Sequence, residues 1–164
     1  MTLALEYLRD RYNEEQSRFD HLENKCSKLL GFSSVVIAAI TAFASTKSGA
    51  IFHPEFFLSE LALAFYLLGA LAVICSWGHA LEALRIRDCT VLPRNRETAE
   101  YLIEVDEETA KRHIYQCYSD TLEKLKIEID EKSKKLNLAY NDIVFSAWCL
   151  GLAAVLFILM EMAR

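Results

Sequence analysis

The chain has 164 residues, of which 53% are hydrophobic and 25% are charged, and its formal net charge is −5 at pH 7. The apolar residues cluster in three stretches that hold almost no charge, which argues against one soluble globule. With 2 Pro, 5 Gly and no regular strand alternation, a disordered, collagen-like or β-barrel chain is excluded. The composition therefore predicts an all-α membrane protein with three transmembrane helices and long helices that project into a cytoplasmic helical bundle.

Residues 1–28 precede the first apolar stretch and are predicted to form a cytoplasmic amphipathic helix. The apolar side chains of this region lie three and four residues apart, with Glu15 as the one interruption. They are Leu5, Leu8, Tyr12, Phe19, Leu22, Cys26 and Leu29. This spacing predicts a heptad seam that continues directly into the membrane. Twenty-eight polar, acid-rich residues are far more than the short basic start of a signal peptide, so a signal peptide is not expected.

Three membrane spans are predicted, at residues 29–45, 56–81 and 143–162. A hydrocarbon core of roughly 30 Å needs about 20 apolar residues, and the shorter first span suffices if Lys28 snorkels to the interface. Residues 46–55 form a short loop between the first two spans. Of the 18 Lys and Arg residues, all but Lys47 and Arg164 lie in 1–28 or 82–142. The positive-inside rule therefore puts the N-terminus and residues 82–142 in the cytoplasm, and the loop and the tail 163–164 outside.

Residues 82–142 are predicted to hold a connector and a long helix. The extension of the second span is predicted to end at Val91, Leu92, Pro93, Arg94 and Asn95, whereas residues 97–105 have no assignment. Asp106 before two glutamates is a typical helix start, and nothing interrupts the helix from there to Met162. A second seam, interrupted at Lys132, comprises Tyr118, Leu122, Leu125, Ile129, Leu136, Tyr140 and Ile143. Because amphipathic helices gain most of their stability from packing, the two seams are expected to pair with each other and with other copies.

The sequence has no motif that supports catalysis, such as a nucleophile beside a base or a phosphate-binding loop. We therefore expect no enzyme and no cofactor. The 5 cysteines are predicted to lie in the cytoplasm or inside spans and to be reduced. His113 and Cys117 stand four residues apart on one helix, but no further close pair completes a metal site. The ionisable residues near the spans are His79, Asp142, Glu60 and Glu161, all at span ends, where an interfacial position is expected.

One face of the first span carries only small or hydroxyl side chains. They alternate at spacings of four and three residues, and they are Ser27, Gly31, Ser34, Ala38, Thr41 and Ser45. We call this set the small stripe. Small residues permit close packing between membrane helices, and hydroxyls tolerate water in a pore. Both interpretations remain open.

A second set on the same helix is basic, and we call it the basic stripe. Its members lie on one face and are Arg11, Arg18, His21, Lys25 and Lys28. The ordinary interpretation is a solvated coiled-coil flank. Alternatively, several copies could bring this face inward and bind the phosphates of a nucleotide or oligonucleotide. At 100° per residue the basic stripe lies nearly opposite the small stripe, so one straight helix cannot line a continuous conduit with both.

The chain resembles the small transmembrane effectors of bacterial antiphage systems, namely the Pycsar transmembrane effectors and the related SLATT proteins. Three features carry this resemblance: the triplet Glu23, Asn24 and Lys25 before the first span, the Pro93–Arg94 element after the second, and the charged helix that leads into the last. The resemblance covers most of the chain.

This resemblance implies a homo-oligomeric effector in the bacterial inner membrane, controlled by a nucleotide signal from a neighbouring nucleotidyltransferase or cyclase. Such effectors disturb the inner membrane and arrest the infected cell. Together with the stripes, it predicts an ion channel gated by a nucleotide or oligonucleotide. The alternative is a non-conducting membrane anchor or scaffold that recruits a partner through its cytoplasmic helices. A small transporter subunit is disfavoured because the spans lack internal charge.

Overall fold

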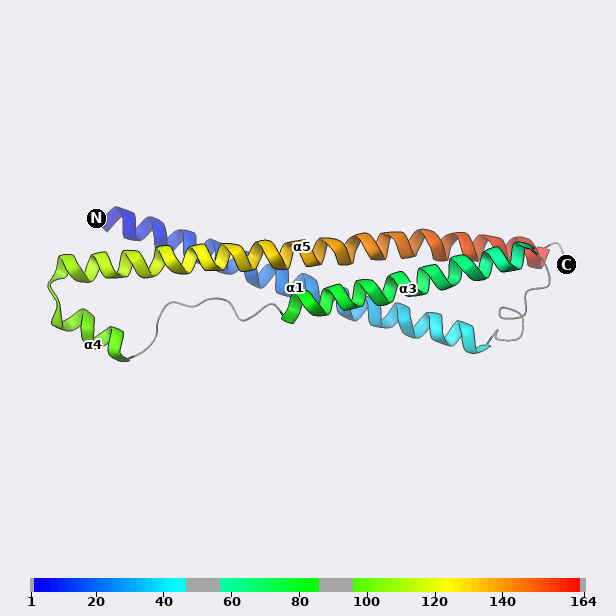
Figure 1. Ribbon diagram of the computed structural model, residues 1–164, viewed down its shortest axis with the longest axis horizontal. Helices are drawn as coiled ribbons and strands as arrows, with labels where there is room; N and C mark the ends of the chain where they lie inside the picture. The colour runs from blue at the N-terminus through cyan, green and yellow to red at the C-terminus, as the bar shows by residue number, and fades with distance from the viewer. Residues whose placement is uncertain (1, 47–56, 86–95, 163–164) are drawn as a thin grey trace. The chain divides into compact units, whose positions relative to one another are not determined.

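The computed structural model of the chain describes residues 2–46, 57–85 and 96–162, and it is helical throughout them except at Val105 and Asp106 (Figure 1). The helices are α1 (Thr2–Thr46), α3 (Phe57–Arg85), α4 (Arg96–Glu104) and α5 (Glu107–Met162). The predicted all-α class is confirmed. The predicted loop after Thr46 and the Pro93–Arg94 element lie outside the described residues.

Both long helices run without a break into an apolar stretch, as the seams predicted. Helix α1 has 45 residues and α5 has 56, and no described residue adopts a positive φ that would break either one. Asp106 caps the start of α5, where the sequence predicted a helix start, because its Oδ2 accepts a hydrogen bond from the Thr109 backbone N–H at 3.0 Å. Hydrogen bonding from Thr109 lowers the pKa of the Asp106 carboxyl below its ordinary value. Residues 96–104, unassigned from sequence, form α4.

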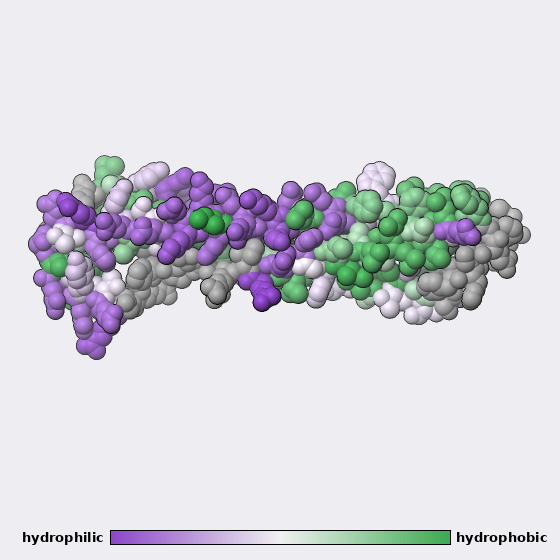
Figure 2. All heavy atoms as spheres, in the orientation of Figure 1, coloured by the Kyte–Doolittle hydropathy of each residue, from purple (hydrophilic) through white to green (hydrophobic). Residues whose placement is uncertain are grey.

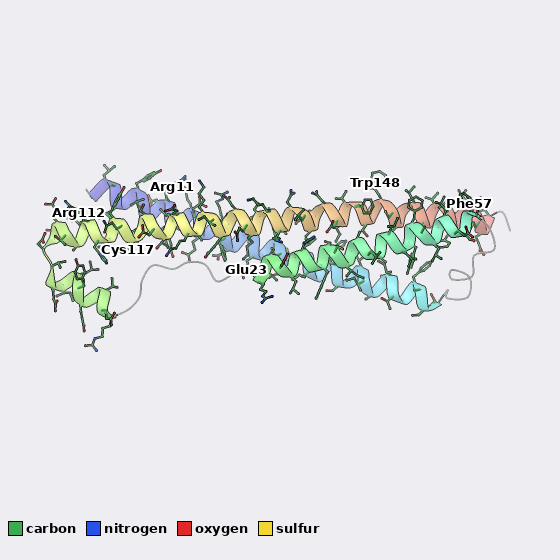
Figure 3. All side chains as sticks on the ribbon, viewed as in Figure 1. Arg11, Glu23, Phe57, Arg112, Cys117 and Trp148 are labelled. Atoms are coloured by element: carbon green, nitrogen blue, oxygen red, sulfur yellow. The ribbon has the colours of Figure 1, made fainter. Side chains whose placement is uncertain are left out.

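Three of the helices are long and apolar enough to cross a membrane: α1, α3 and α5. In each, the most apolar window is largely exposed within the chain itself. Large apolar side chains stand on that exposed surface, among them Val35, Leu71 and Trp148, and Trp148 projects outward from α5 (Figure 3). Exposed apolar surface on this scale fits a lipid environment rather than water.

The chain divides into two compact units. Unit 1 comprises residues 1–24 and 86–133, and unit 2 comprises residues 25–85 and 134–164. Hydrophilic side chains dominate the visible face of unit 1, and apolar ones gather on that of unit 2 (Figure 2). The charged and the apolar chemistry of the sequence therefore separate into different units.

The core of unit 1 joins the two predicted seams. Tyr12 and Phe19 of α1 are buried against Leu125 and Ile129 of α5. Leu22, Tyr118 and Leu122 pack around this cluster, and the rings of Tyr12 and Tyr118 meet edge to face with centroids 5.9 Å apart. Pairing of the seams within one chain is thus confirmed, and Lys132, the predicted interruption, is fully buried among them.

The core of unit 2 includes a face of α3 that consists mostly of residues with small side chains. Its buried residues are Ala62, Tyr66, Gly69, Ala72, Val73, Ser76, Ala80 and Ala83. The α5 residues buried in the same unit are Leu136, Ala139, Ser146, Cys149 and Ala153. Small side chains let helix backbones approach closely, which is the usual basis of helix packing in membranes.

The predicted seam of α5 is wrong at Tyr140, which is 42% exposed. Ala139 is fully buried in its place, and its carbonyl oxygen accepts a hydrogen bond from Ser76 Oγ at 2.7 Å. The physical reason is the short distance between α3 and α5 at this level, which admits a methyl group but no phenol ring.

Candidate functional site

The small stripe of α1 faces away from the packed interior of the chain. All six of its members, Ser27, Gly31, Ser34, Ala38, Thr41 and Ser45, are exposed. The residues that α1 buries in unit 2 are instead Cys26, Leu29 and Ser33. Helix packing within one chain therefore does not explain the small stripe, and what remains is packing between copies, contact with water or contact with lipid.

The hydroxyl groups of the small stripe bond to their own helix. Ser34 Oγ donates to the Leu30 carbonyl at 2.8 Å, Thr41 Oγ1 to Ile37 at 2.9 Å and Ser45 Oγ to Thr41 at 2.9 Å. These bonds satisfy the hydroxyl protons in an apolar setting and leave lone pairs of the oxygens unused. At Ser34, Thr41 and Ser45 the face can therefore stand in lipid, against a second helix, or along a water-filled path without an unsatisfied donor.

Sequence reasoning missed the small face of α3, although its signal is present in the spacing of Ala62, Gly69, Ser76, Ala80 and Ala83. The helices α3 and α5 approach closely at Gly69, whose carbonyl accepts a hydrogen bond from Ser146 Oγ at 2.9 Å. A Cβ added to Gly69 would lie 2.7 Å from Leu150 Cγ. The chain thus has two small faces, and the one on α3 forms the contact within the chain.

The basic stripe is also exposed along its whole length. Arg11, Arg18 and His21 belong to unit 1, and Lys25 and Lys28 belong to unit 2. In unit 1, Arg11 Nη1 lies 2.7 Å from Glu14 Oε2 and Arg18 Nη1 lies 3.0 Å from Glu15 Oε1. The hydrogen bond that Arg11 donates to the Glu14 carboxylate raises the pKa of the Arg11 guanidinium, which keeps it charged. Local acids therefore offset part of the positive charge that the sequence pattern predicted.

Two residues of the basic stripe line a groove on unit 1. The groove has a volume of about 300 Å³, and its lining comprises Ser17, Arg18, His21 and Leu22 from α1 with Ile129, Asp130 and Ser133 from α5. A guanidinium, an imidazole and two hydroxyls are groups that bind phosphate oxygens, whereas Asp130 repels them. Arg11 is not among the lining residues.

A thiol and an imidazole lie together on α5 of unit 1. Cys117 Sγ is 3.6 Å from His113 Nε2, and the His113 ring meets Tyr101 of α4 edge to face with centroids 5.0 Å apart. Within the described residues no cluster of three or more His, Cys, Asp or Glu side chains could hold a metal ion. Among the described residues, Cys26, Cys75, Cys117 and Cys149 form no disulfide, and Cys89 lies outside those residues.

Comparison of the chain with protein-family models, with curated proteins and with solved structures finds no match.

Proposed function

We propose that this chain is a homo-oligomeric membrane effector whose spans assemble into a gated ion pathway. Following the resemblance to antiphage effectors, the pathway opens or closes in response to a nucleotide or oligonucleotide, and conduction arrests the infected cell. Three spans of one chain cannot enclose a pore, so assembly is part of the proposal. The distribution of Lys and Arg supports an orientation with unit 1 in the bacterial cytoplasm.

The observation that carries the proposal is the exposed small stripe of α1. A small face that packed α1 against α3 or α5 would be buried in the chain, and this one is exposed at every position. Its hydroxyl oxygens have unused lone pairs, which water and ions can use along a pathway. The face therefore suits a surface that several copies present to a common axis.

Ligand control is best supported where the basic stripe lines the groove on unit 1. Arg18 and His21 stand there beside two serine hydroxyls, and both lie on the helix that continues into the first span. A ligand that binds one packing of unit 1 better than another shifts the population of the two states by its difference in affinity. Such a shift would gate the pathway.

A specific observation favours the alternative function as an anchor or scaffold. Unit 1 exposes large apolar and aromatic side chains, notably Leu3 at 81%, Tyr7 at 60% and Ile103 at 83%. Exposed apolar groups on an otherwise charged unit are typical of a surface that docks a partner. A scaffold of this kind needs no ion pathway.

The test is the conductance of purified protein in planar bilayers, with and without cyclic mononucleotides and cyclic dinucleotides. Thr41→Trp places a large ring on the small stripe, and we expect it to reduce single-channel conductance by about tenfold or more because the pathway narrows. Val155→Trp is the matched control, since Val155 is 54% exposed on α5 and lies outside the stripe. Native mass spectrometry of each variant reports whether the oligomer persists.

Three results would count against the proposal. Wild-type protein that never conducts would favour the scaffold. A Thr41→Trp oligomer with unchanged conductance would remove the small stripe from the pathway. Loss of the oligomer in Thr41→Trp, with Val155→Trp intact, would show that the stripe packs between copies rather than lining the pore.

A further inference from the structure

Four charged or titratable side chains meet at one end of α3 in unit 2. His79 and Glu82 come from α3, and Lys135 and Asp142 come from α5. Lys135 Nζ lies 2.7 Å from Glu82 Oε2. The His79 ring lies between two carboxylates, with Nδ1 3.9 Å from Glu82 Oε2 and Nε2 3.6 Å from Asp142 Oδ2. We call these four residues the His79 cluster.

The geometry of the His79 cluster is incomplete when the imidazole is neutral. A neutral imidazole has one N–H, so it can donate to one of the two carboxylates and presents a lone pair to the other. Asp142 Oδ2 is buried and accepts no hydrogen bond from the described residues. An imidazolium has two N–H groups, and they would point to the two carboxylates from a ring already placed between them.

Protonation of His79 also changes the net charge of the cluster. With a neutral imidazole, the positive charge of Lys135 balances only one of the two carboxylates, Glu82 and Asp142, so the cluster carries one net negative charge. Protonation of His79 brings the cluster to neutrality. Helix α1 contributes Lys25 and Lys28 to unit 2, and both are exposed. The ring and Asp142 are themselves about one-third exposed, at 36% and 32%, so protons have access from solvent.

We propose that the His79 cluster is a proton-dependent clasp between α3 and α5. Proton uptake by His79 joins Glu82 and Asp142 through one imidazolium and tightens the contact, and proton loss loosens it. The clasp lies close to the Ser76–Ala139 hydrogen bond, where the two helices are already in contact. It is a property of the folded chain and holds whether or not the protein conducts ions.

The experiment is thermal unfolding of the full chain in detergent, followed by circular dichroism at about pH 6 and about pH 8, which bracket the range where histidines as a class titrate. We expect the wild type to melt about 2–4 °C higher at the lower pH, the shift that a contact of this size produces in a chain of this length. His79→Gln should lose the pH dependence and melt low at both values. His79→Lys, which carries a permanent charge, should also lose it but melt high at both.

Two further variants separate the clasp from other titrations. His113→Gln removes a histidine of unit 1 and should keep the wild-type pH dependence. Asp142→Asn keeps His79 but removes one carboxylate, and we expect it to lose at least half of the pH-dependent shift. This variant also answers the question if His79→Gln fails to fold.

The proposal is overturned if the wild type melts at the same temperature at both pH values. It is also overturned if His79→Gln or Asp142→Asn keeps the full wild-type shift, because the proton would then act elsewhere. If only His113→Gln lost the pH-dependent shift in melting temperature, the responsible proton would belong to unit 1. None of these outcomes depends on conductance, so the clasp and the proposed ion pathway can fail separately.

Discussion

At the scale of single residues, Lys132 is the position where the structure departs most from ordinary expectation. Its side chain is fully buried, and Nζ lies 3.9 Å from the centroid of the Phe19 ring. Nζ finds no hydrogen-bond acceptor among the described residues. A desolvated cation–π contact contributes about 2 kcal/mol, whereas burial of an ammonium costs several kcal/mol. The desolvation cost is therefore larger, and Lys132 weakens the pairing of the two seams.

We expect Lys132→Met to stabilise unit 1 by about 1–4 kcal/mol, because it keeps the length of the side chain and removes the buried charge. The measurement is denaturant unfolding of the full chain in detergent. Lys124→Met is the matched control, since Lys124 is exposed on the same helix, and a change within about 0.5 kcal/mol is expected there. A lower stability of Lys132→Met would mean that the ammonium makes a favourable interaction in the assembled protein.

At the scale of elements, α1 and α3 illustrate how two similar faces take different roles. Both helices carry a stripe of small residues, but α3 buries its stripe against α5 and α1 exposes its own. The contact between α3 and α5 is fixed by backbone carbonyls that accept side-chain hydrogen bonds, at Gly69 from Ser146 and at Ala139 from Ser76. Such bonds require backbones that lie close together, so small residues are needed on both sides.

Two glycines of α3 provide a direct test of this packing. A Cβ at Gly69 would lie 2.7 Å from Leu150 Cγ and 2.8 Å from its Cδ2, so Gly69→Ala should destabilise unit 2 by about 1–3 kcal/mol through overpacking. A Cβ at Gly78 would meet nothing within 4 Å, so Gly78→Ala should be neutral or stabilising by up to about 1 kcal/mol through helix propensity. The measurement is the melting temperature of each variant in detergent. If Gly69→Ala and Gly78→Ala changed it equally, the close contact at Gly69 would be contradicted.

At the scale of the whole molecule, the proposed function divides between the two units, with ligand control in unit 1 and conduction in unit 2. The basic stripe of unit 1 is exposed and its arginines pair with acids on their own helix, at 2.7 Å for Arg11 and 3.0 Å for Arg18. Exposed ion pairs of this kind contribute little to the stability of a fold. Changes to these arginines therefore probe ligand binding without unfolding the chain.

We expect Arg11→Glu with Arg18→Glu to abolish the conductance response to added nucleotides while native mass spectrometry shows the wild-type oligomer. The reason is electrostatic, since the variant turns a cationic face next to the groove into an anionic one. Arg112→Glu with Lys126→Glu makes the same change of charge at exposed positions of α5 and should keep the response. An unchanged response in the first variant would remove the basic stripe from the mechanism.

The sequence by itself determined the all-α class, the three apolar helices and the continuity of α1 and α5, because these depend on local rules. Hydrophobic runs of membrane length, heptad spacing and a capping residue such as Asp106 act over a few residues of chain. The seam residues Tyr12, Phe19, Leu125 and Ile129 followed from the same periodicity. Of the His79 cluster, the sequence singled out only His79 and Asp142, as separate ionisable residues at the ends of spans.

Only the tertiary structure decided which faces meet. The small face of α3 is buried within the chain, whereas that of α1 is exposed. In α5, Ala139 is buried instead of Tyr140, and Lys132 is buried as well. The Gly69–Ser146 hydrogen bond joins residues 77 positions apart. Contacts of this kind depend on how closely two backbones approach and which side chains then fit, and no single helix encodes that distance in its own periodicity.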